Sequence, residues 1–313
     1  MTTTLPETLS ALDSARLAFR NELLESGMLI GTSVPGLYGR SGPFEAIVSG
    51  LDALLSDVAA PLEAEVLRFP PVFPRIDFER TDYIASFPDL SGVVSSFERG
   101  DKEHAALLAA RSAGEPWDGW LDPTDVVLTP AICHPLYATL EARIPEGGRT
   151  FDLSGYVFRH EPSIDPMRMQ AFRMREFVFV GSADAAQRYR DTWLGHAMDT
   201  LASLGLAVQA VPANDPFFGR AGRMLVSAQL RENLKVEIIV PIYGDLHEGT
   251  AITSANCQRD HLTAPFDIRT ADGEVAHGAC IGFGMERTTL ALLRTHGLDV
   301  SLWPSSVRAK LGL

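Results

Sequence analysis

Several charged side chains stand among strand-like residues in the middle of the chain. Residues 156–158 and 177–180 have the composition of strands and predict a hairpin-like pair. Set into this stretch are four arginines and two glutamates: Arg159, Arg168, Arg173, Arg175, Glu161 and Glu176. A guanidinium binds phosphate oxygens through paired, charge-assisted hydrogen bonds. Arg159 and Glu161, two residues apart on one predicted strand face, would present a cation to a phosphate and a carboxylate to a base or an amine; salt bridges across a surface hairpin are the alternative.

The three cysteines, Cys133, Cys257 and Cys280, are the second group of residues with chemical potential. An odd number of cysteines and no visible secretory signal indicate a reducing, cytoplasmic setting. Taken singly, each is better explained as an inert core thiol than as a reactive or metal-binding one, because free cysteine is commonly buried.

Composition narrows the class of protein. The 313 residues are 46% hydrophobic and carry a net charge of −13, and no run of 18 apolar residues predicts a membrane span. No basic run or arm suits a polyanion such as tRNA. The phosphate loop, the nucleophile elbow and the zinc-protease motif are all missing from the sequence, so a bound ATP would depend on arginines.

The elements that must position these residues follow from periodicity. Helices are expected over residues 5–27, 44–58, 101–112 and 185–204, and a last one from Met285. After Gly205 strands cluster without intervening helices, at residues 207–212, 235–241, 249–255, 265–268 and 276–284. This order favours an α+β fold with an antiparallel sheet flanked by helices. We divide the chain into an N-terminal helical segment, 1–27, and a catalytic domain, 28–313.

The order of the charged motifs resembles that of a known class of enzymes. "FRHE" at 158–161, "RMREF" at 173–177 and "GFGMER" at 282–287 resemble motifs 2 and 3 of the class II aminoacyl-tRNA synthetases. Residues 44–74 stand where motif 1, the dimer interface, would lie, which implies a homodimer. "KVEIIVP" and "TSANCQRD" resemble the seryl-tRNA synthetase branch, but the long tRNA-binding arm is missing. A core of this kind looks like the amino acid:[carrier protein] ligases.

That resemblance implies a reaction and its partners. Such ligases activate a small amino acid with ATP and pass it to the phosphopantetheine thiol of a carrier protein; glycine is the first choice here and alanine the second. A tRNA ligase and a catalytically inactive regulatory paralogue are the alternatives. "FFGRAGR", with Arg220 and Arg223, is as compatible with a carrier-docking patch as with a turn that packs its aromatic residues.

The resemblance also implies roles for individual residues. Arg159 would hold the α-phosphate of ATP and Arg287 the γ-phosphate, while Phe177 would stack on adenine. Glu161 would face the adenine amino group and Arg173 the γ-phosphate. Polar contacts to Mg²⁺, ATP or the amino acid are expected from Glu237 and Asn256. Arg168 and Arg175 receive no role.

A zinc site is implied in the same way. Cys133, Glu176 and Cys280 match the three ligands of the family, and three protein ligands leave a fourth position open for the substrate amine. His134 is the alternative nearby donor. Cys257 is expected to be a packing thiol.

Overall fold

A seven-stranded sheet forms the centre of the protein. The computed structural model describes residues 9–214 and 233–313. Within them the strand order is β3-β7-β8-β12-β11-β10-β9, antiparallel except for the parallel pair β3–β7. The strands are β3 (Glu65–Leu67), β7 (Arg149–Phe158), β8 (Ala171–Gly181), β9 (Gln209–Pro212), β10 (Lys235–Val240), β11 (Thr250–Arg259) and β12 (His277–Gly284). The α+β prediction is confirmed, with the sheet predominantly antiparallel.

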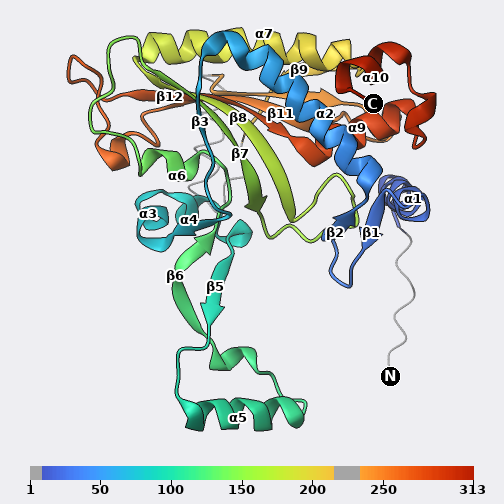
Figure 1. The fold of residues 1–313 in the computed structure, drawn as a ribbon, viewed down its shortest axis with the longest axis vertical. Coiled ribbons are helices and arrows are strands. Elements are labelled where there is room, and N and C mark those ends of the chain that lie inside the picture. Colours follow the sequence, from blue (N-terminus) through green and yellow to red (C-terminus); the bar gives the residue numbers. More distant parts are fainter. Residues whose placement is uncertain (1–8, 215–232) are drawn as a thin grey trace.

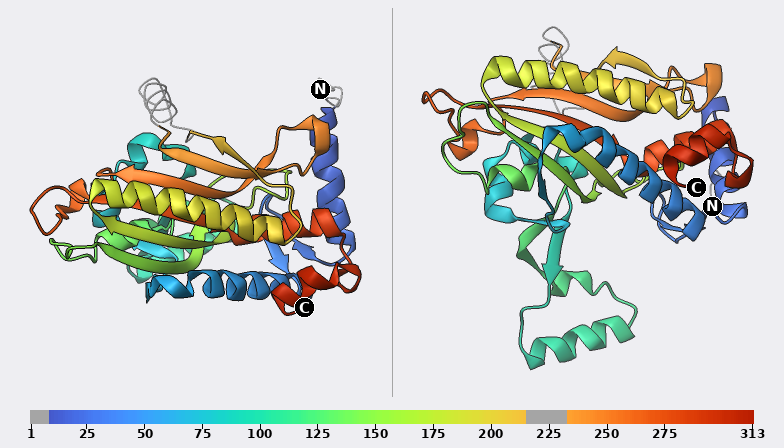
Figure 2. Two further views of the ribbon diagram at one scale, coloured as in Figure 1. Left: turned by 90° about the horizontal axis from the view of Figure 1, so that it is seen from above. Right: turned by 45° about the horizontal axis from the view of Figure 1, so that its top comes forward.

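Helices flank this sheet and close the ends of the molecule. They are α1 (Ala11–Glu25), α2 (Gly42–Ala59), α6 (His134–Tyr137), α7 (Ala183–Ser203), α9 (Met285–His296) and α10 (Ser305–Leu311). Figures 1 and 2 show α7 running along the sheet, and α1 and α10 at the same end of the molecule. None of the described helices combines the length and apolar composition that a bilayer crossing requires.

Helix α2 shows how the sequence determines a packed element. The Ser41 hydroxyl accepts a hydrogen bond from the Phe44 amide, so the first turn is capped. The apolar residues recur at helical spacing and are buried: Phe44, Ile47, Val48, Leu51 and Leu55. At Gly50 a Cβ atom would lie 2.1 Å from the Leu311 carbonyl oxygen. Only glycine therefore allows α10 to pack this closely on α2.

The N-terminal helix shares the main hydrophobic core. Phe19 and Leu23 of α1 are buried in the same cluster as α2 and the sheet. A two-stranded sheet, β1 (Leu29–Gly31) and β2 (Tyr38–Arg40), joins α1 to α2. Helix α1 therefore packs on the catalytic body, although the sequence placed a boundary after residue 27.

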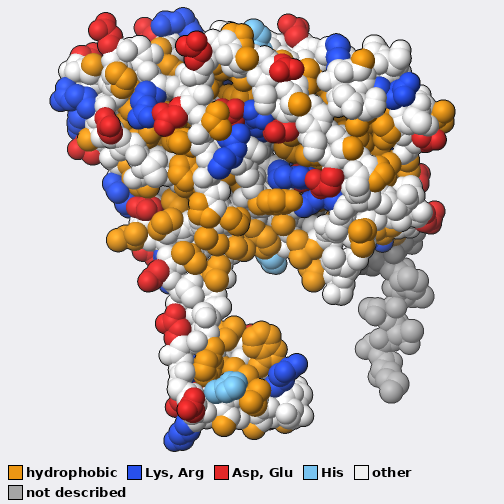
Figure 3. Space-filling model, in the orientation of Figure 1, with side chains coloured by type: hydrophobic (Ala, Val, Ile, Leu, Met, Phe, Trp, Pro, Cys, Tyr) orange, Lys and Arg blue, Asp and Glu red, His pale blue; other side chains and the backbone are white. Residues whose placement is uncertain are grey.

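A second, smaller sheet carries a protruding arm. Its order is β4-β6-β5, formed by β4 (Val72–Pro74), β5 (Val93–Ser96) and β6 (Asp122–Leu128), with α3 (Arg75–Arg80) and α4 (Tyr83–Ser86) beside it. Between β5 and β6 lies α5 (Asp101–Ser112), which stands away from the body in Figure 1 and buries none of its residues. Figure 3 shows hydrophobic side chains gathered on this arm and on the body above it.

Most of the expected elements are observed. The predicted helix over 101–112 coincides with α5, and the hairpin-like pair is the antiparallel pair β7–β8. The strand expected over residues 265–268 is wrong, because Ala264–Phe266 forms a 3-10 turn and Asp267 adopts φ 52°. Proline at position 265 suits the first turn of such a helix and removes a donor that a strand would need.

Candidate active site

The loop between β7 and β8 brings the motif 2 side chains to the end of the sheet. Strand β7 ends at Phe158, so Arg159 and Glu161 leave from this loop and do not share a strand face as predicted. Arg159 is fixed because its amide donates to the Gln170 carbonyl at 2.9 Å and its Nε donates to the Pro130 carbonyl at 3.0 Å. The guanidinium also lies 5.9 Å from the centre of the Phe172 ring. Glu161 pairs with Arg168 at 3.3 Å.

Arg287 enters the same region from the first turn of α9. Its Nε donates to the Met167 carbonyl at 2.7 Å and its Nη1 to the Ala251 carbonyl at 3.3 Å. Burial, together with the charge of Arg168, lowers the pKa of Arg287 to about 10, and the charge of Glu161 opposes this shift. Arg159 and Glu237 act on the same guanidinium. The predicted ATP residues Arg159, Glu161 and Glu237 are thus all near enough to Arg287 to influence its charge.

Arg173 and Phe177 point away from these residues. Successive side chains of a strand alternate between the faces of the sheet, and these two odd-numbered residues of β8 face α2 and α7. Phe177 is fully buried and stacks on Trp193 with ring centres 4.5 Å apart. It has no surface to offer an adenine ring, so its predicted stacking role is wrong.

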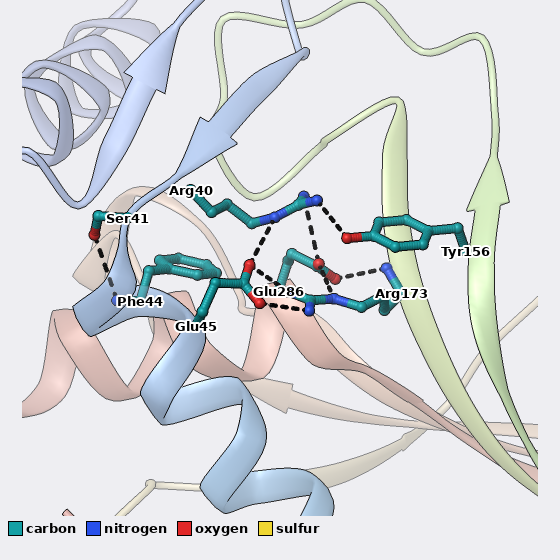
Figure 4. Close-up of polar contacts among 7 residues, drawn as sticks. All are labelled: Arg40, Ser41, Phe44, Glu45, Tyr156, Arg173 and Glu286. Carbon is teal, nitrogen blue, oxygen red and sulfur yellow. Dashed lines mark hydrogen bonds and ion pairs between the residues drawn. The ribbon is translucent and has the colours of Figure 1, made fainter.

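Arg173 belongs to a network of ion pairs instead. Figure 4 shows its guanidinium between Glu45 of α2 and Glu286 of α9. Nη1 and Nη2 donate to Glu45 at 2.6 and 2.9 Å, and Nε donates to Glu286 at 2.8 Å. Burial lowers the pKa of Arg173, but the hydrogen bonds to Glu45 and the charge of Glu286 outweigh it and the pKa is raised. All three nitrogens are committed to carboxylates, which corrects the predicted γ-phosphate role.

The residues that the sequence analysis missed are Phe172 and Arg168. "RMQAF" at 168–172 repeats the R-x-x-x-F spacing of "RMREF", five residues earlier. Because five is odd, the two registers put the aromatic ring on opposite faces of β8. The structure favours the earlier register, since Phe172 lies beside Arg159 and Arg168 acts on Arg287. The R-x-x-x-F spacing in the sequence therefore indicated both matches, at 168–172 and at 173–177. The alternation of side chains between the faces of a strand would have shown that they cannot both face the site.

Arg175, the other arginine without a predicted role, is structural. It is 2% exposed and donates to Asp152 at 2.6 and 3.0 Å and to Asp52 at 2.6 Å. It therefore fastens β8 to β7 and to α2.

A cluster of two thiols and a carboxylate lies on the same face of β8 as Phe172. Cys133 precedes α6, Glu176 lies on β8 and Cys280 on β12, and all three are at most 4% exposed. Hydrogen bonding to Cys280 and burial raise the pKa of Cys133, and burial raises the pKa of Glu176 to about 6. Arg159 opposes that shift, so it lies near the cluster as well as near Arg287.

Amides of β11 complete the cluster. The Gln258 Nε2 donates to Cys280 Sγ at 3.4 Å, and Asn256 Nδ2 donates to the same sulfur at 3.5 Å. The Tyr137 hydroxyl donates to Gln258 Oε1 at 3.0 Å and so orients the amide. The predicted polar residue Asn256 is therefore found at the thiols.

The predicted zinc site is not confirmed. Within residues 9–214 and 233–313, no group of three His, Cys, Asp or Glu side chains is arranged to hold a metal ion. The three predicted ligands are nevertheless neighbours, because Cys280 and Glu176 both raise the pKa of Cys133. Glu176 Oε2 is buried and has no hydrogen-bond partner in the described part of the chain. Two thiols and one unsatisfied carboxylate oxygen are a donor set that suits zinc.

Two other side chains were considered for this site, Cys257 as a packing thiol and His134 as an alternative donor. Cys257 is buried on the face of β11 opposite Asn256 and Gln258, away from the cluster. His134 packs its ring against Tyr83 at 5.6 Å, and burial lowers its pKa to about 4. Arg220 and Arg223 lie outside the described residues.

The fold and this site define the class of protein. No protein-family model matches the chain. A solved structure of M. kandleri SerRS in complex with A. aeolicus tRNASec superposes with a TM-score of 0.80 at 22% identity, over 94% of this chain and 60% of that one. The protein therefore has the fold of a class II aminoacyl-tRNA synthetase catalytic core.

Two curated relatives identify the family more narrowly. Amino acid--[acyl-carrier-protein] ligase 2 of Bradyrhizobium diazoefficiens is 43% identical over 281 residues, which cover 89% of this chain and 84% of the relative. Ligase 1 of the same organism is 40% identical over 280 residues, 89% of this chain and 85% of the relative. The chain belongs to the amino acid--[acyl-carrier-protein] ligases.

Proposed function

We propose that this protein activates a small amino acid with ATP and transfers it to the phosphopantetheine thiol of a carrier protein. Membership of the ligase family supports the two half-reactions, and the arrangement of charged residues supports the first. The observation that carries the proposal is the place of Arg159, which acts electrostatically on Arg287 and on Glu176. Arg159 is therefore near both Arg287, which we assign to the phosphates, and Glu176, which we assign to the amino acid.

The proposed first step is an in-line displacement at the α-phosphorus. A carboxylate oxygen of the amino acid forms a bond to that phosphorus, and the bond to the bridging oxygen of pyrophosphate breaks. Negative charge grows on the phosphorus oxygens and on the leaving group, and fixed guanidiniums stabilise it. Arg159 would serve the α-phosphate, Arg287 the leaving phosphates, and Phe172 the adenine ring. Glu161 would accept from the adenine amino group.

The proposed second step uses no further protein nucleophile. The carrier thiolate forms a bond to the carbonyl carbon of the aminoacyl adenylate, and the bond to the AMP oxygen breaks. The thiol proton leaves to solvent or to AMP, and the products are an aminoacyl thioester and AMP.

We also propose that Cys133, Glu176 and Cys280 hold zinc. The open fourth position would bind the substrate α-amine and thereby select a free amine. Gln258 and Asn256 would donate hydrogen bonds to the sulfurs, which orients them. Mg²⁺ would accompany ATP, with Glu237 within reach of the phosphate region.

Substrate and assembly complete the proposal. Glycine is the first candidate and alanine the second, and a homodimer would form through the region of α2 and β3. The net charge of −13 argues against a polyanion such as tRNA as acceptor. An inactive paralogue is disfavoured because both arginines and the thiol cluster are in place.

The deciding experiment offers both acceptors. Purified protein receives ATP, Mg²⁺ and radiolabelled glycine or alanine, with holo carrier protein in one reaction and total tRNA in another. The matched control is apo carrier protein, which differs only in the missing phosphopantetheine. We expect label on the holo carrier, released by mild base as a thioester. Label on tRNA and none on the carrier would overturn the proposal.

A further inference from the structure

The turn at Met167 connects Arg287 to a buried carboxylate that the reaction does not use. The Met167 carbonyl accepts from Arg287 Nε at 2.7 Å, and the amide of the same residue donates to Asp165 Oδ1 at 3.0 Å. Met167 is fully buried and Asp165 is 4% exposed. Asp165, the Met167 backbone and Arg287 therefore form a series of contacts that ends at the guanidinium.

Asp165 is itself held from two distant parts of the chain. Tyr243 follows β10, and its hydroxyl donates to Asp165 Oδ1. Arg16 of α1 forms an ion pair with Oδ2 at 3.2 Å. A buried carboxylate with a cation, a hydroxyl and an amide as partners is well satisfied and therefore rigid.

The other flank of the loop is fixed by the segment before β2. The backbone amide of Gln170 donates to the Gly36 carbonyl at 2.8 Å, and its side chain donates to the Pro35 carbonyl at 2.7 Å. Gly36 adopts φ +78°, and a Cβ atom there would lie 3.2 Å from the Arg168 carbonyl oxygen. The loop is thus held on both flanks, and Asp165 holds the residue whose carbonyl contacts Arg287.

We propose that Asp165 is a positioning residue that acts through the Met167 backbone to orient Arg287 toward the phosphates. This inference rests on the proposed function. The Met167 amide and the Met167 carbonyl belong to successive peptide units that meet at its Cα atom, so the turn that Asp165 fixes also sets the direction of the carbonyl. Without the carboxylate, the Met167 amide and the Tyr243 hydroxyl lose their acceptor and this turn is less constrained. The carbonyl then fixes Nε less firmly, and the other hydrogen bond of Arg287 within the described residues is the longer one to Ala251. A displacement of about 1 Å in a charge-stabilising group lowers rates by up to about 100-fold.

The test measures amino-acid-dependent exchange of pyrophosphate into ATP. We expect Asp165→Ala to lower kcat by about 10- to 100-fold, with a smaller change in KM for the amino acid. Asp165→Asn keeps an acceptor oxygen for the Met167 amide and should restore most of the rate. Asp13→Ala is the matched control, because Asp13 is the other carboxylate that pairs with Arg16 but lies exposed on α1 and should leave kcat unchanged.

A double-mutant cycle separates positioning from general support of the fold. In an Arg287→Ala background, Asp165→Ala should have no further effect on the residual exchange, since its influence passes through Arg287. An equal loss in both backgrounds would overturn the inference. If Asp165→Ala fails to fold, Tyr243→Phe, which removes one partner of the same oxygen, replaces it in the cycle with the same criterion.

Failure of the proposed function would look different. In that case wild-type protein would show no exchange with any amino acid. The cycle is then run on ATP affinity, measured by calorimetry, and the inference falls if Asp165→Ala weakens ATP binding equally with and without the Arg287 side chain.

Discussion

Arg173 lies between Glu45 and Glu286. We therefore predict that its loss lowers the stability of the fold and leaves the rate of the reaction nearly unchanged. In Arg173→Leu, the donors that the described part of the chain leaves to the Glu286 side chain, 1% exposed, are the residue-173 amide at 2.6 Å and Arg40 at 3.4 Å. Breaking a buried ion pair by removing one partner costs about 3–5 kcal/mol. Because Arg40 remains nearby, and because Glu45 is 37% exposed and loses little, we expect about 3 kcal/mol.

This value converts to a measurable shift. For a chain of this size, each kcal/mol moves Tm by about 2 °C, so Arg173→Leu should melt about 6 °C below wild type. Pyrophosphate exchange, measured well below both melting temperatures, should stay within a few-fold of wild type. The matched control is Arg75→Leu, which breaks the exposed Arg75–Glu79 pair on α3 and should change stability by less than about 1 kcal/mol.

The opposite pattern would refute the reasoning. If Arg173 bound the γ-phosphate, Arg173→Leu would melt like wild type and exchange would fall by about 10²–10³, the usual loss for one charge-stabilising donor.

Three further predictions concern the site. Arg287→Ala should lower pyrophosphate exchange by about 10²–10³ in a folded protein, and near-normal exchange would remove Arg287 from the phosphate site. Metal analysis should find about one zinc per chain, lost in Cys280→Ser and kept in Cys257→Ser; zinc retained in Cys280→Ser would contradict its place as a ligand. Phe172→Ala should raise KM for ATP, whereas Phe177→Ala, which loses the core contacts with Trp193, should leave KM unchanged; both rings are buried, so each truncation should cost about 3–5 kcal/mol of stability. A raised KM for ATP in Phe177→Ala and not in Phe172→Ala would reject the assignment of opposite faces.

The sequence was sufficient for those parts of the fold that depend on local pattern. The apolar spacing of α2, the limits of α5 and the hairpin of β7 and β8 follow from periodicity, and all are observed. The approach of Arg159 to Arg287 was foreseen only through the resemblance, since the two residues lie on separate motifs and no local pattern relates them.

The misplaced residues share one cause. Arg173 and Phe177 fit a motif by spacing, but spacing does not state which face of a strand a side chain occupies. The neighbours of Arg173, Glu45 and Glu286, come from elements distant in sequence, and the neighbour of Phe177, Trp193, comes from the helix that follows β8. Tertiary contacts therefore decide which face of the strand each side chain occupies, which the motif alone does not specify.

The arm that carries α5 has a thermodynamic consequence of its own. Since none of its 12 residues is buried, the helix gains almost nothing from the core, and Gly100 offers no side-chain cap. An isolated helix shorter than about 12–15 residues is marginal in water. The amide protons of α5 should therefore exchange with deuterium through local openings of low free energy. Those of α2 should exchange only through openings with a free energy close to that of global unfolding. The molecule thus combines two energy scales in one chain: a body that opens rarely, and an arm whose helix can melt and reform without disturbing it.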